Sequence, residues 1–269
     1  MTELLPLLIA MLATGIAGGL LAGLLGVGGG IVIVPALEFA MSVLGVDPAI
    51  RMHIAVATSL ATIIPTSIAS ARAHYRHDAL NTTVIKHWWA AVFIGSAAGA
   101  VIASQLHSRV LSGIFAVVAL LVAIKMMLPL DNKVIRDKVP EGYPSRAVPA
   151  AIGLISSMMG IGGGSMSVPT LTLFNEPIHR AVGTSAFIGL LIAIPGAIGF
   201  MFTGAGHPNL PPGSIGFVNL PGLLVIAPAT ILAAPWGAKL AHAMKRRHLS
   251  LLFGAFLLIV ALRMINQAL

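Results

Sequence analysis

Cysteine is absent from the 269-residue chain. This absence excludes disulfide bonds, thiolate metal sites and any chemistry that passes sulfur to a protein thiol. Charge is scarce as well, because only 9% of the residues are Asp, Glu, Lys or Arg, whereas 57% are hydrophobic. Soluble domains of this length carry far more charge. The composition, with a mean hydropathy of +0.97, therefore predicts an all-α polytopic membrane protein.

The charge-free intervals are long enough to cross a bilayer several times. A spanning helix needs about 20 mainly apolar residues, and the intervals cover residues 4–37, 52–71, 87–108, 147–175 and 181–238. The acidic residues lie near the ends of these intervals, so we expect no carboxylate at the membrane midplane. The net charge of +8 comes from Lys and Arg between the apolar segments. It therefore indicates loops that face anionic lipid, with no nucleic-acid partner.

The second half of the chain repeats the first. GVGGGIVIVPAL, from Gly26, returns as GIGGGSMSVPTL, from Gly160, and a Thr-Ser pair and a proline follow each motif in the same order. The closing segments of the two halves also correspond. Landmarks that recur in one order predict an internal duplication. We expect a first transmembrane repeat over residues 1–130, a cytoplasmic connector over 131–146 and a second transmembrane repeat over 147–269.

Basic residues in the loops orient the two halves, because Lys and Arg concentrate on the cytoplasmic side. The loop over residues 72–86 is basic, whereas its equivalent after Thr203 carries no charge. At the next pair of loops the relation reverses, since the loop near Arg109 is weakly basic and its equivalent over 239–247 is strongly basic. Equivalent loops thus fall on opposite sides of the membrane. The sequence predicts inverted-topology repeats with both termini external.

Each half reads as a glycine-interrupted helical hairpin followed by three transmembrane helices. Hydrophobic runs and turn signals place these helices at about 49–72, 84–106 and 109–130, then 179–203, 215–240 and 248–267. Residues 147–174 are too few for two full spans, so we expect the second hairpin to dip into the membrane and return. The first hairpin is longer, and two complete crossings stay open for it.

The glycine motifs mark backbone that leaves the helix inside the membrane. Glycine costs roughly 1 kcal/mol per position relative to alanine in a helix interior, and non-helical backbone at that depth has to be buried in protein or line a polar cavity. Short helices follow from near Ile31 and Ser165, and a helix N-terminus attracts an anion through its free N–H groups and its dipole. We therefore expect the motifs to enclose a small anion, close helix packing being the alternative.

The candidate binding residues are the motif positions and the two Thr-Ser pairs. They are Gly26, Gly28, Gly29, Gly30, Ile31, Thr58, Ser59, Gly160, Gly162, Gly163, Gly164, Ser165, Ser167, Thr184 and Ser185. The hydroxyl groups of the pairs have an alternative partner in the backbone of their own helices. Candidates for gating or for attracting the anion, with interfacial anchoring as the alternative, are Arg51, His53, His179 and Arg180. The other histidines show no metal-ligand spacing, so we expect no metal and no other cofactor.

The duplicated GxGGGxxxVP motif, with A-V-x-T-S after it, resembles the TauE/SafE family of sulfite and organosulfonate exporters over nearly the whole chain. The stretch most similar to the family's first repeat is AVATSLATIIPTSIASARAHYRHDAL, residues 55–80, although Ala57 replaces a more common glycine. The resemblance implies a transporter in the bacterial inner membrane that exports sulfite or an organosulfonate.

The residues and the resemblance together predict a secondary carrier that works by alternating access around the glycine site. Its partners are a small anionic substrate and the lipid bilayer, and a homodimer stays open. The alternatives are a carrier or channel for another small anion, such as thiosulfate or a carboxylate. We expect no enzyme, because the chain offers no cysteine, no buried carboxylate pair and no HExxH motif.

Overall fold

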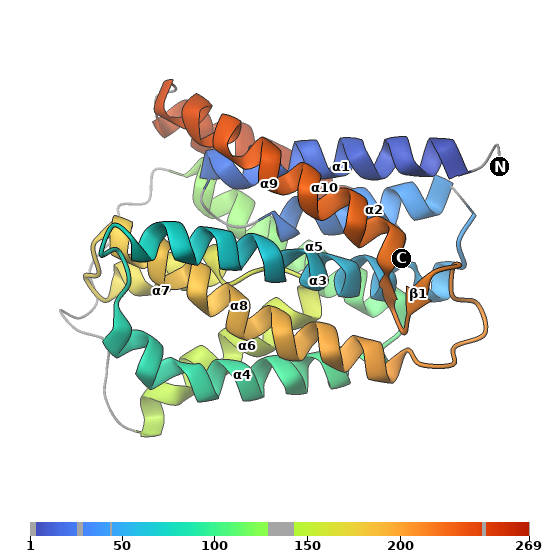
Figure 1. Cartoon of the computed structure of the whole chain (residues 1–269), viewed down its shortest axis with the longest axis horizontal. Helices are drawn as coiled ribbons and strands as arrows, with labels where there is room; N and C mark the ends of the chain where they lie inside the picture. The colour runs from blue at the N-terminus through green and yellow to red at the C-terminus, as the bar shows by residue number, and fades with distance from the viewer. Residues whose placement is uncertain (1–3, 26–28, 44, 129–142, 244–245, 269) are drawn as a thin grey trace.

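The computed structural model describes residues 4–25, 29–43, 45–128, 143–243 and 246–268, and helices dominate them (Figure 1). The first half contains α1 (Leu4–Leu25), α2 (Gly30–Val43), α3 (Pro48–Tyr75), α4 (Thr82–Gln105) and α5 (Ser108–Met127). The second half contains a 3-10 turn (Tyr143–Arg146), α6 (Ala147–Met159), α7 (Gly164–Leu173), α8 (Ile178–Thr203), β1 (Ser214–Ile215), β2 (Val218–Asn219), α9 (Leu220–Ala243) and α10 (Arg246–Ala268).

Six of the described helices are long and apolar enough to cross a membrane, namely α3, α4, α5, α8 and most of α9 and α10. Apart from the start of α9, their bounds lie within a few residues of the predicted ones. Large apolar side chains face outward on them, such as Leu121, which is 62% exposed, and Ile259, which is 68% exposed. A surface of this kind suits lipid rather than water. The predicted all-α polytopic membrane fold is confirmed.

The glycine motifs separate two helices in each half, as predicted. In the second half α6 has 13 residues and α7 has 10. They are about 20 Å and 15 Å long, so neither crosses a hydrocarbon core of about 30 Å. In the first half α1 has 22 residues but α2 only 14, or about 21 Å. The sequence left open whether this hairpin crosses the membrane twice. Helix α2 is too short to make the second complete crossing by itself.

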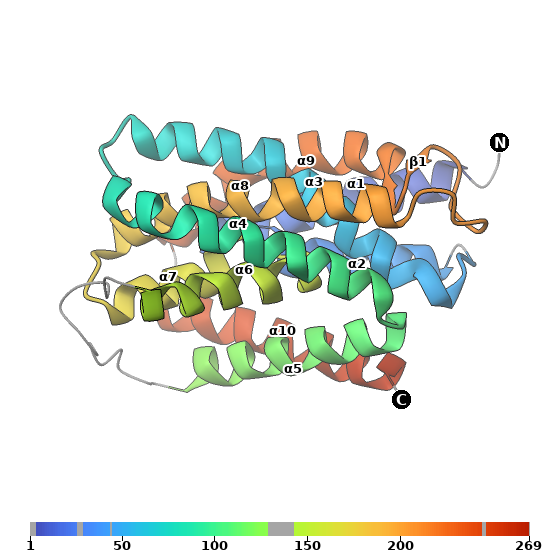
Figure 2. The same ribbon diagram turned by 90° about the horizontal axis from the view of Figure 1, so that it is seen from below.

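The start of α9 corrects the sequence prediction, because the helix begins at Leu220 instead of residue 215. The residues before it form an antiparallel hairpin of β1 and β2. Gly216, at its turn, has a φ of +53°, and a Cβ there would lie 2.0 Å from the carbonyl oxygen of Met201 in α8. A right-handed helix does not pass through such a residue. The hairpin lies where α1 begins and α10 ends (Figure 2), and we call this the hairpin end of the bundle.

Helices α3 and α8 pack on each other inside the bundle and run in opposite directions (Figures 1 and 2). Asn209, after α8, bonds to Asp47 at the start of α3. Ala79, after α3, contacts Gly183 at the start of α8. Around this pair, α1 packs on α9, α6 on α4 and α5 on α10. These contacts join one half to the other as an inverted repeat requires, and the inverted relation itself stays a prediction.

Glycines bring two of these helix pairs into backbone contact. Between α6 and α4, a Cβ on Gly153 would lie 2.2 Å from the carbonyl oxygen of Val92. Between α9 and α1, a Cβ on Gly237 would lie 2.0 Å from the carbonyl oxygen of Leu20. Small residues permit such close approach of membrane helices, where dispersion contacts supply much of the attraction. The pairs α4–α6 and α1–α9 therefore form tight contacts that anchor the first helix of each glycine hairpin.

Substitution of Gly153 by valine is expected to lower the free energy of unfolding by about 1–3 kcal/mol, because the side chain forces α6 away from α4. Gly113→Val is the matched control, since a Cβ on Gly113 has its nearest neighbour, Ala268 Cβ, at 3.7 Å. Both changes place valine in a helix, so propensity cancels. Thermal unfolding of the detergent-purified proteins measures the difference, and equal melting temperatures would contradict the assigned packing.

Candidate functional site

The two glycine motifs meet where α2, α3 and α6 come together. A Cβ on Gly30, the first residue of α2, would lie 2.5 Å from the carbonyl oxygen of Gly160 and 2.9 Å from Ile161 Cα. Gly160 ends α6 with a φ of +67° and is itself enclosed by Val34 of α2 and Val56 of α3. Only glycine fits at these two positions without displacing backbone. Close packing, the alternative to anion binding, therefore accounts for Gly30 and Gly160 in this structure.

The serines of the two Thr-Ser pairs differ in their bonding. Ser59 Oγ donates a hydrogen bond of 2.7 Å to the carbonyl oxygen of Gly160, which ties α3 to the motif of the other half. Ser185, the equivalent residue on α8, is 1% exposed, and its Oγ has no hydrogen-bond partner. A buried hydroxyl without a partner is uncommon in a folded protein and calls for an explanation. Ser185 is therefore a stronger candidate for a ligand contact than Ser59.

The second motif leads into the N-terminus of α7. The first hydrogen bond of this helix runs from the Ser167 N–H to the Gly163 carbonyl oxygen at 2.7 Å. The N–H groups of Gly164, Ser165 and Met166 precede that bond, so they have no acceptor within the helix. They point out of its N-terminal end, where the helix dipole is positive. The backbone alone thus presents three donors to an anion.

Buried polar side chains belong to the residues around this N-terminus. Ser167 Oγ is fully buried and unpartnered, like that of Ser185. Both residues lie beside Gly163, whose Cβ position is 3.2 Å from the Ser185 carbonyl oxygen. Gly162 is less crowded, because a Cβ there would meet only the Ile63 side chain, at 3.5 Å or more. The second motif therefore combines amides without an intrahelical acceptor and unpartnered hydroxyls with a glycine, Gly162, that is less tightly packed than Gly163.

The first motif is described only in part. Gly26 and Gly28 lie outside the described residues. The N–H groups of Val32 and Ile33 bond to the Gly29 carbonyl oxygen at 3.0 and 2.9 Å, so the first turn of α2 begins there. Ile31 is 1% exposed and offers only its backbone as a polar contact. The predicted short helix after each motif is thus present in both halves.

The threonines of the pairs hold helix ends in the opposite half. Thr58 Oγ1 accepts from the backbone N–H of Asn219 at 3.0 Å, and Thr184 Oγ1 accepts from that of Asn81 at 2.8 Å. Asn219 precedes α9 and Asn81 precedes α4, and their side-chain oxygens accept from the first N–H groups of these helices. The sequence missed both asparagines, because their partners are 161 and 103 residues away. In the sequence, the only sign of these helix caps is an asparagine that stands just before an apolar run.

His53 joins α3 to the end of α4. Its Nε2 lies 3.2 Å from the carbonyl oxygen of Ala103 and 3.0 Å from that of Leu106, so it is the protonated nitrogen that donates. The ring stacks on Phe217 of the hairpin, with centroids 5.0 Å apart, and is almost fully buried. These contacts give His53 a positioning role at the hairpin end.

The other predicted basic pair lies at the surface. His179 and Arg180 are exposed in the first turn of α8. Arg180 Nε lies 3.7 Å from Glu176, which also accepts a 2.9 Å hydrogen bond from the Asn81 side chain. The structure therefore brings this pair to the start of α4 and away from the junction of the motifs.

Asp47 fixes the start of α3 at the hairpin end. Its carboxylate accepts from the Ala49 N–H at 2.9 Å and from the Asn209 side chain at 2.7 Å. The backbone bond first, and then the Asn209 bond, hold the pKa of Asp47 below its ordinary value. A lowered pKa means that folding stabilises the ionised form. The contact is therefore present above the ordinary pKa of aspartate and is lost only as the pH falls through the lowered value.

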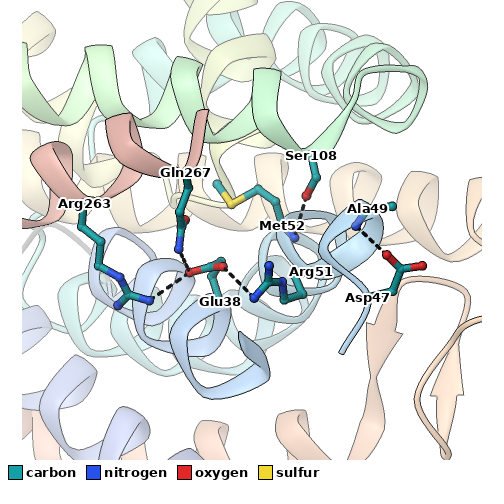
Figure 3. A network of polar contacts seen from close by, with 8 residues as sticks. All are labelled: Glu38, Asp47, Ala49, Arg51, Met52, Ser108, Arg263 and Gln267. Atoms are coloured by element: carbon teal, nitrogen blue, oxygen red, sulfur yellow. Dashed lines mark hydrogen bonds and ion pairs between the residues drawn. The ribbon is translucent and has the colours of Figure 1, made fainter. Parts of the chain in front are cut away.

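Glu38 lies in a buried cluster of polar side chains. It is 3% exposed on α2, with Arg263 Nη2 at 3.3 Å, Gln267 Nε2 at 2.8 Å and Arg51 Nη1 at 3.9 Å (Figure 3). The break at the glycine motif starts a new helix that returns into the bundle, so Glu38 is carried into the protein. Arg263, inside an apolar span, was the available signal, because an ionisable residue there needs a partner.

Comparison with known proteins places the whole chain. The family described as Sulfite exporter TauE/SafE matches residues 11–264. The chain belongs to the TauE/SafE family. It is 32% identical to a "Probable membrane transporter protein" of Haemophilus influenzae, covering 94% of this chain and 96% of the relative. A protein of the same description from Methanocaldococcus jannaschii is 28% identical, covering 97% and 96%. No solved structure matches the chain.

The TauE/SafE assignment agrees with the fold. The match covers residues 11–264 and the relatives extend over both halves, so the matched region spans both glycine motifs and the long helices. The relatives are described as membrane transporters and not as enzymes. This TauE/SafE protein is a membrane transporter.

Replacement of Ser59 by alanine is expected to lower the free energy of unfolding by about 1 kcal/mol, because the Gly160 carbonyl oxygen loses its donor. Ser185→Ala, the matched change in the other half of this TauE/SafE protein, removes no protein hydrogen bond and is expected to leave stability unchanged. Thermal unfolding without added anion separates the two. A larger loss in Ser185→Ala would show that its hydroxyl has a structural partner.

Replacement of Thr184 by valine keeps the shape of the side chain but leaves the Asn81 N–H without its acceptor. A donor left unpaired at such a site costs about 1–3 kcal/mol. Thr66→Val is the control, because Thr66 Oγ1 donates only to carbonyl oxygens of its own helix. Urea or thermal unfolding, with hydrogen exchange at the start of α4, measures the change. Similar results for both variants would refute the capping role of Thr184.

Proposed function

We propose that this TauE/SafE protein is a secondary carrier that exports a small sulfur-containing oxyanion, such as sulfite or an organosulfonate, from the bacterial cytoplasm. The observation that supports it best is the group of unpaired donors at the second motif. It comprises the N–H groups of Gly164, Ser165 and Met166 and the hydroxyls of Ser167 and Ser185.

The donors favour an anion over a cation. Backbone N–H groups only donate, and the positive end of the α7 dipole lies at the same place. The buried hydroxyls are free to donate as well. An anion held in this way needs no charged side chain beside it, so it is bound without a permanent ion pair that would slow its release. Sulfite offers three oxygen acceptors to such a set of donors.

The preference for a sulfur oxyanion comes from the family, because geometry supports only the charge and small size of the ligand. The family is described as sulfite exporters. The Cβ position of Gly162 has ordinary van der Waals contact with the Ile63 side chain, which is apolar. A small oxyanion with one apolar substituent, as in an organosulfonate, is compatible with this neighbourhood.

Alternating access follows from the pairing of the halves. In the proposal the halves are inverted repeats, with the connector in the cytoplasm and both termini outside the inner membrane. The end of α6 meets α2 and α3 at the glycine junction, α7 packs on α8, and α5 and α10 pack on each other. Movement of the glycine hairpins against the long helices would open the site to either side.

The test is a thermal-shift panel of sulfite, sulfoacetate, thiosulfate, sulfate and acetate on wild type, Gly162→Val and Ser185→Ala. Gly162 is preferred to Gly163, because a Cβ on Gly163 would lie 2.9 Å from Ile188 Cγ2 and 3.0 Å from the Gly189 nitrogen, so a fold defect would confuse the result. Ser104→Ala is the control for loss of a hydroxyl, since Ser104 only donates to its own helix.

Stabilisation of wild type by a sulfur oxyanion, abolished by Gly162→Val and weakened about tenfold in apparent affinity by Ser185→Ala, is the expected result, since one charge-assisted hydrogen bond contributes on the order of 1.5 kcal/mol. Ser104→Ala should match wild type. Stabilisation by acetate or thiosulfate alone would move the proposal to the corresponding anion. Equal binding by all variants would remove the site from α7.

A further inference from the structure

A cavity opens on the surface where α3 ends, at the end of the bundle opposite the hairpin end (Figure 2). Its volume is about 270 Å³. Four lining residues follow one face of the last turns of α3, one belongs to the loop before α4, and one comes from α8. They are Ala71, Arg72, Tyr75, Arg76, Leu80 and Phe187. The cavity therefore combines apolar walls with two guanidinium groups.

The cavity lies at the depth of lipid headgroups. Helix α3 has 28 residues, or about 42 Å, which exceeds a hydrocarbon core of about 30 Å. Its charge-free interval, residues 52–71, ends at Arg72. The turns from Arg72 onward therefore reach past the hydrocarbon. Tyr75, on these turns, is 70% exposed, and tyrosine is a residue type that collects at the membrane interface.

Neither arginine of the cavity is paired with an acid. Arg72 and Arg76 are one helical turn apart on the same face of α3, and both are exposed. Within the part of the chain that the structure describes, no carboxylate forms an ion pair with either of them. Like charges at this spacing repel each other. A phosphate group between them would replace this repulsion with charge-assisted hydrogen bonds, which guanidinium groups often form in pairs.

The acids near the cavity do not cancel its charge. Residues 72–86 include three basic residues and one acid, Asp78, which gives a net charge of +2 with neutral histidines. Glu176, near the start of α8, is already paired with Arg180. In the connector, residues 131–142 carry three acidic and three basic residues, so they add no net charge. The excess positive charge therefore remains and attracts anionic headgroups.

We propose that this cavity binds an anionic phospholipid, with the lipid phosphate between Arg72 and Arg76 and an acyl chain against Leu80 and Phe187. The arginines alone accept any phosphate. The apolar walls favour a phosphate that carries a chain, because every buried methylene group adds to the affinity. The site does not depend on which anion the protein transports. In the predicted topology it lies in the cytoplasmic leaflet.

A lipid in this position would bridge the two central helices. The arginines belong to α3, whereas Phe187 belongs to α8. The loop after α3 already touches α8 nearby, where a Cβ on Gly183 would lie 2.2 Å from the Ala79 carbonyl oxygen. Bound lipid adds to this contact between the helices. A ligand that binds only the folded protein stabilises it, so the lipid should raise the melting temperature.

The experiment measures lipid binding to the detergent-purified full chain by native mass spectrometry and by thermal shift. The probes are phosphatidylglycerol, phosphatidylcholine and glycerol phosphate, which carries a headgroup phosphate without acyl chains. The variants are Arg76→Gln, the double variant Arg72→Gln with Arg76→Gln, and the control Lys86→Gln. Lys86 is exposed on α4 and does not line the cavity, so the control removes the same charge as Arg76→Gln from the same end of the bundle.

Wild type is expected to bind phosphatidylglycerol and to melt at a higher temperature with it. Phosphatidylcholine should bind several-fold more weakly, because its choline cation opposes the guanidinium groups, and glycerol phosphate should have no effect. Arg76→Gln should bind phosphatidylglycerol about tenfold more weakly, as expected for the loss of one charge-assisted hydrogen bond. The double variant should bind more weakly still, and Lys86→Gln should match wild type.

The arginines have no acidic partner in the described chain, so all variants should melt at the wild-type temperature without lipid. Any fold defect is therefore visible before lipid is added. If glycerol phosphate stabilises wild type as strongly as phosphatidylglycerol does, the site holds a free anion and the lipid proposal is wrong. Equal binding of phosphatidylglycerol by wild type and the double variant, or equal losses in Arg76→Gln and Lys86→Gln, would also overturn it.

Discussion

The structure depends on one constraint, which is that a backbone N–H or C=O group inside a membrane needs a partner. Long helices meet it by themselves, and they form most of this chain. At each glycine motif one helix ends and another starts inside the bundle, so backbone groups there lack partners within a helix. At the end of α6, the Gly160 carbonyl oxygen accepts a hydrogen bond from Ser59 of the opposite half. At the start of α7 three backbone N–H groups have no acceptor within the helix. In the proposed function, the transported anion is their acceptor.

The same constraint explains why the Thr-Ser pairs are buried on the central helices. Three of their four hydroxyls form hydrogen bonds with backbone groups of the opposite half, namely the N–H groups of Asn219 and Asn81 and the Gly160 carbonyl oxygen. Each half thus supplies the polar groups that complete the other, while glycines at the α4–α6 and α1–α9 contacts let the helices approach closely enough for these bonds. A half on its own would leave these groups unpaired, so the duplicated units fold as one body.

Sequence reasoning predicted what hydrophobic length and repetition determine. The long helices and the two glycine hairpins have strong local signals, and their bounds were close. It failed where a distant contact decides. The backbone of Met201 leaves room only for a glycine turn at Gly216, and no local pattern in the sequence reveals this contact. The predicted start of α9 therefore lies before the observed start at Leu220. Glu38 sits at the end of an apolar run, and the sequence does not reveal that it is buried, because its surroundings depend on the direction that the chain takes after Gly30. The sequence also could not separate glycines that close packing requires, such as Gly160, from a less crowded one, such as Gly162.

The two halves share a pattern but not a state, and this difference fits the proposed mechanism. Ser59 is bonded while Ser185, the equivalent residue, has no hydrogen-bond partner. In a carrier built from inverted repeats, the state open to the other side is obtained when the halves exchange their local conformations. On that mechanism the opposite state would bond Ser185 and free Ser59.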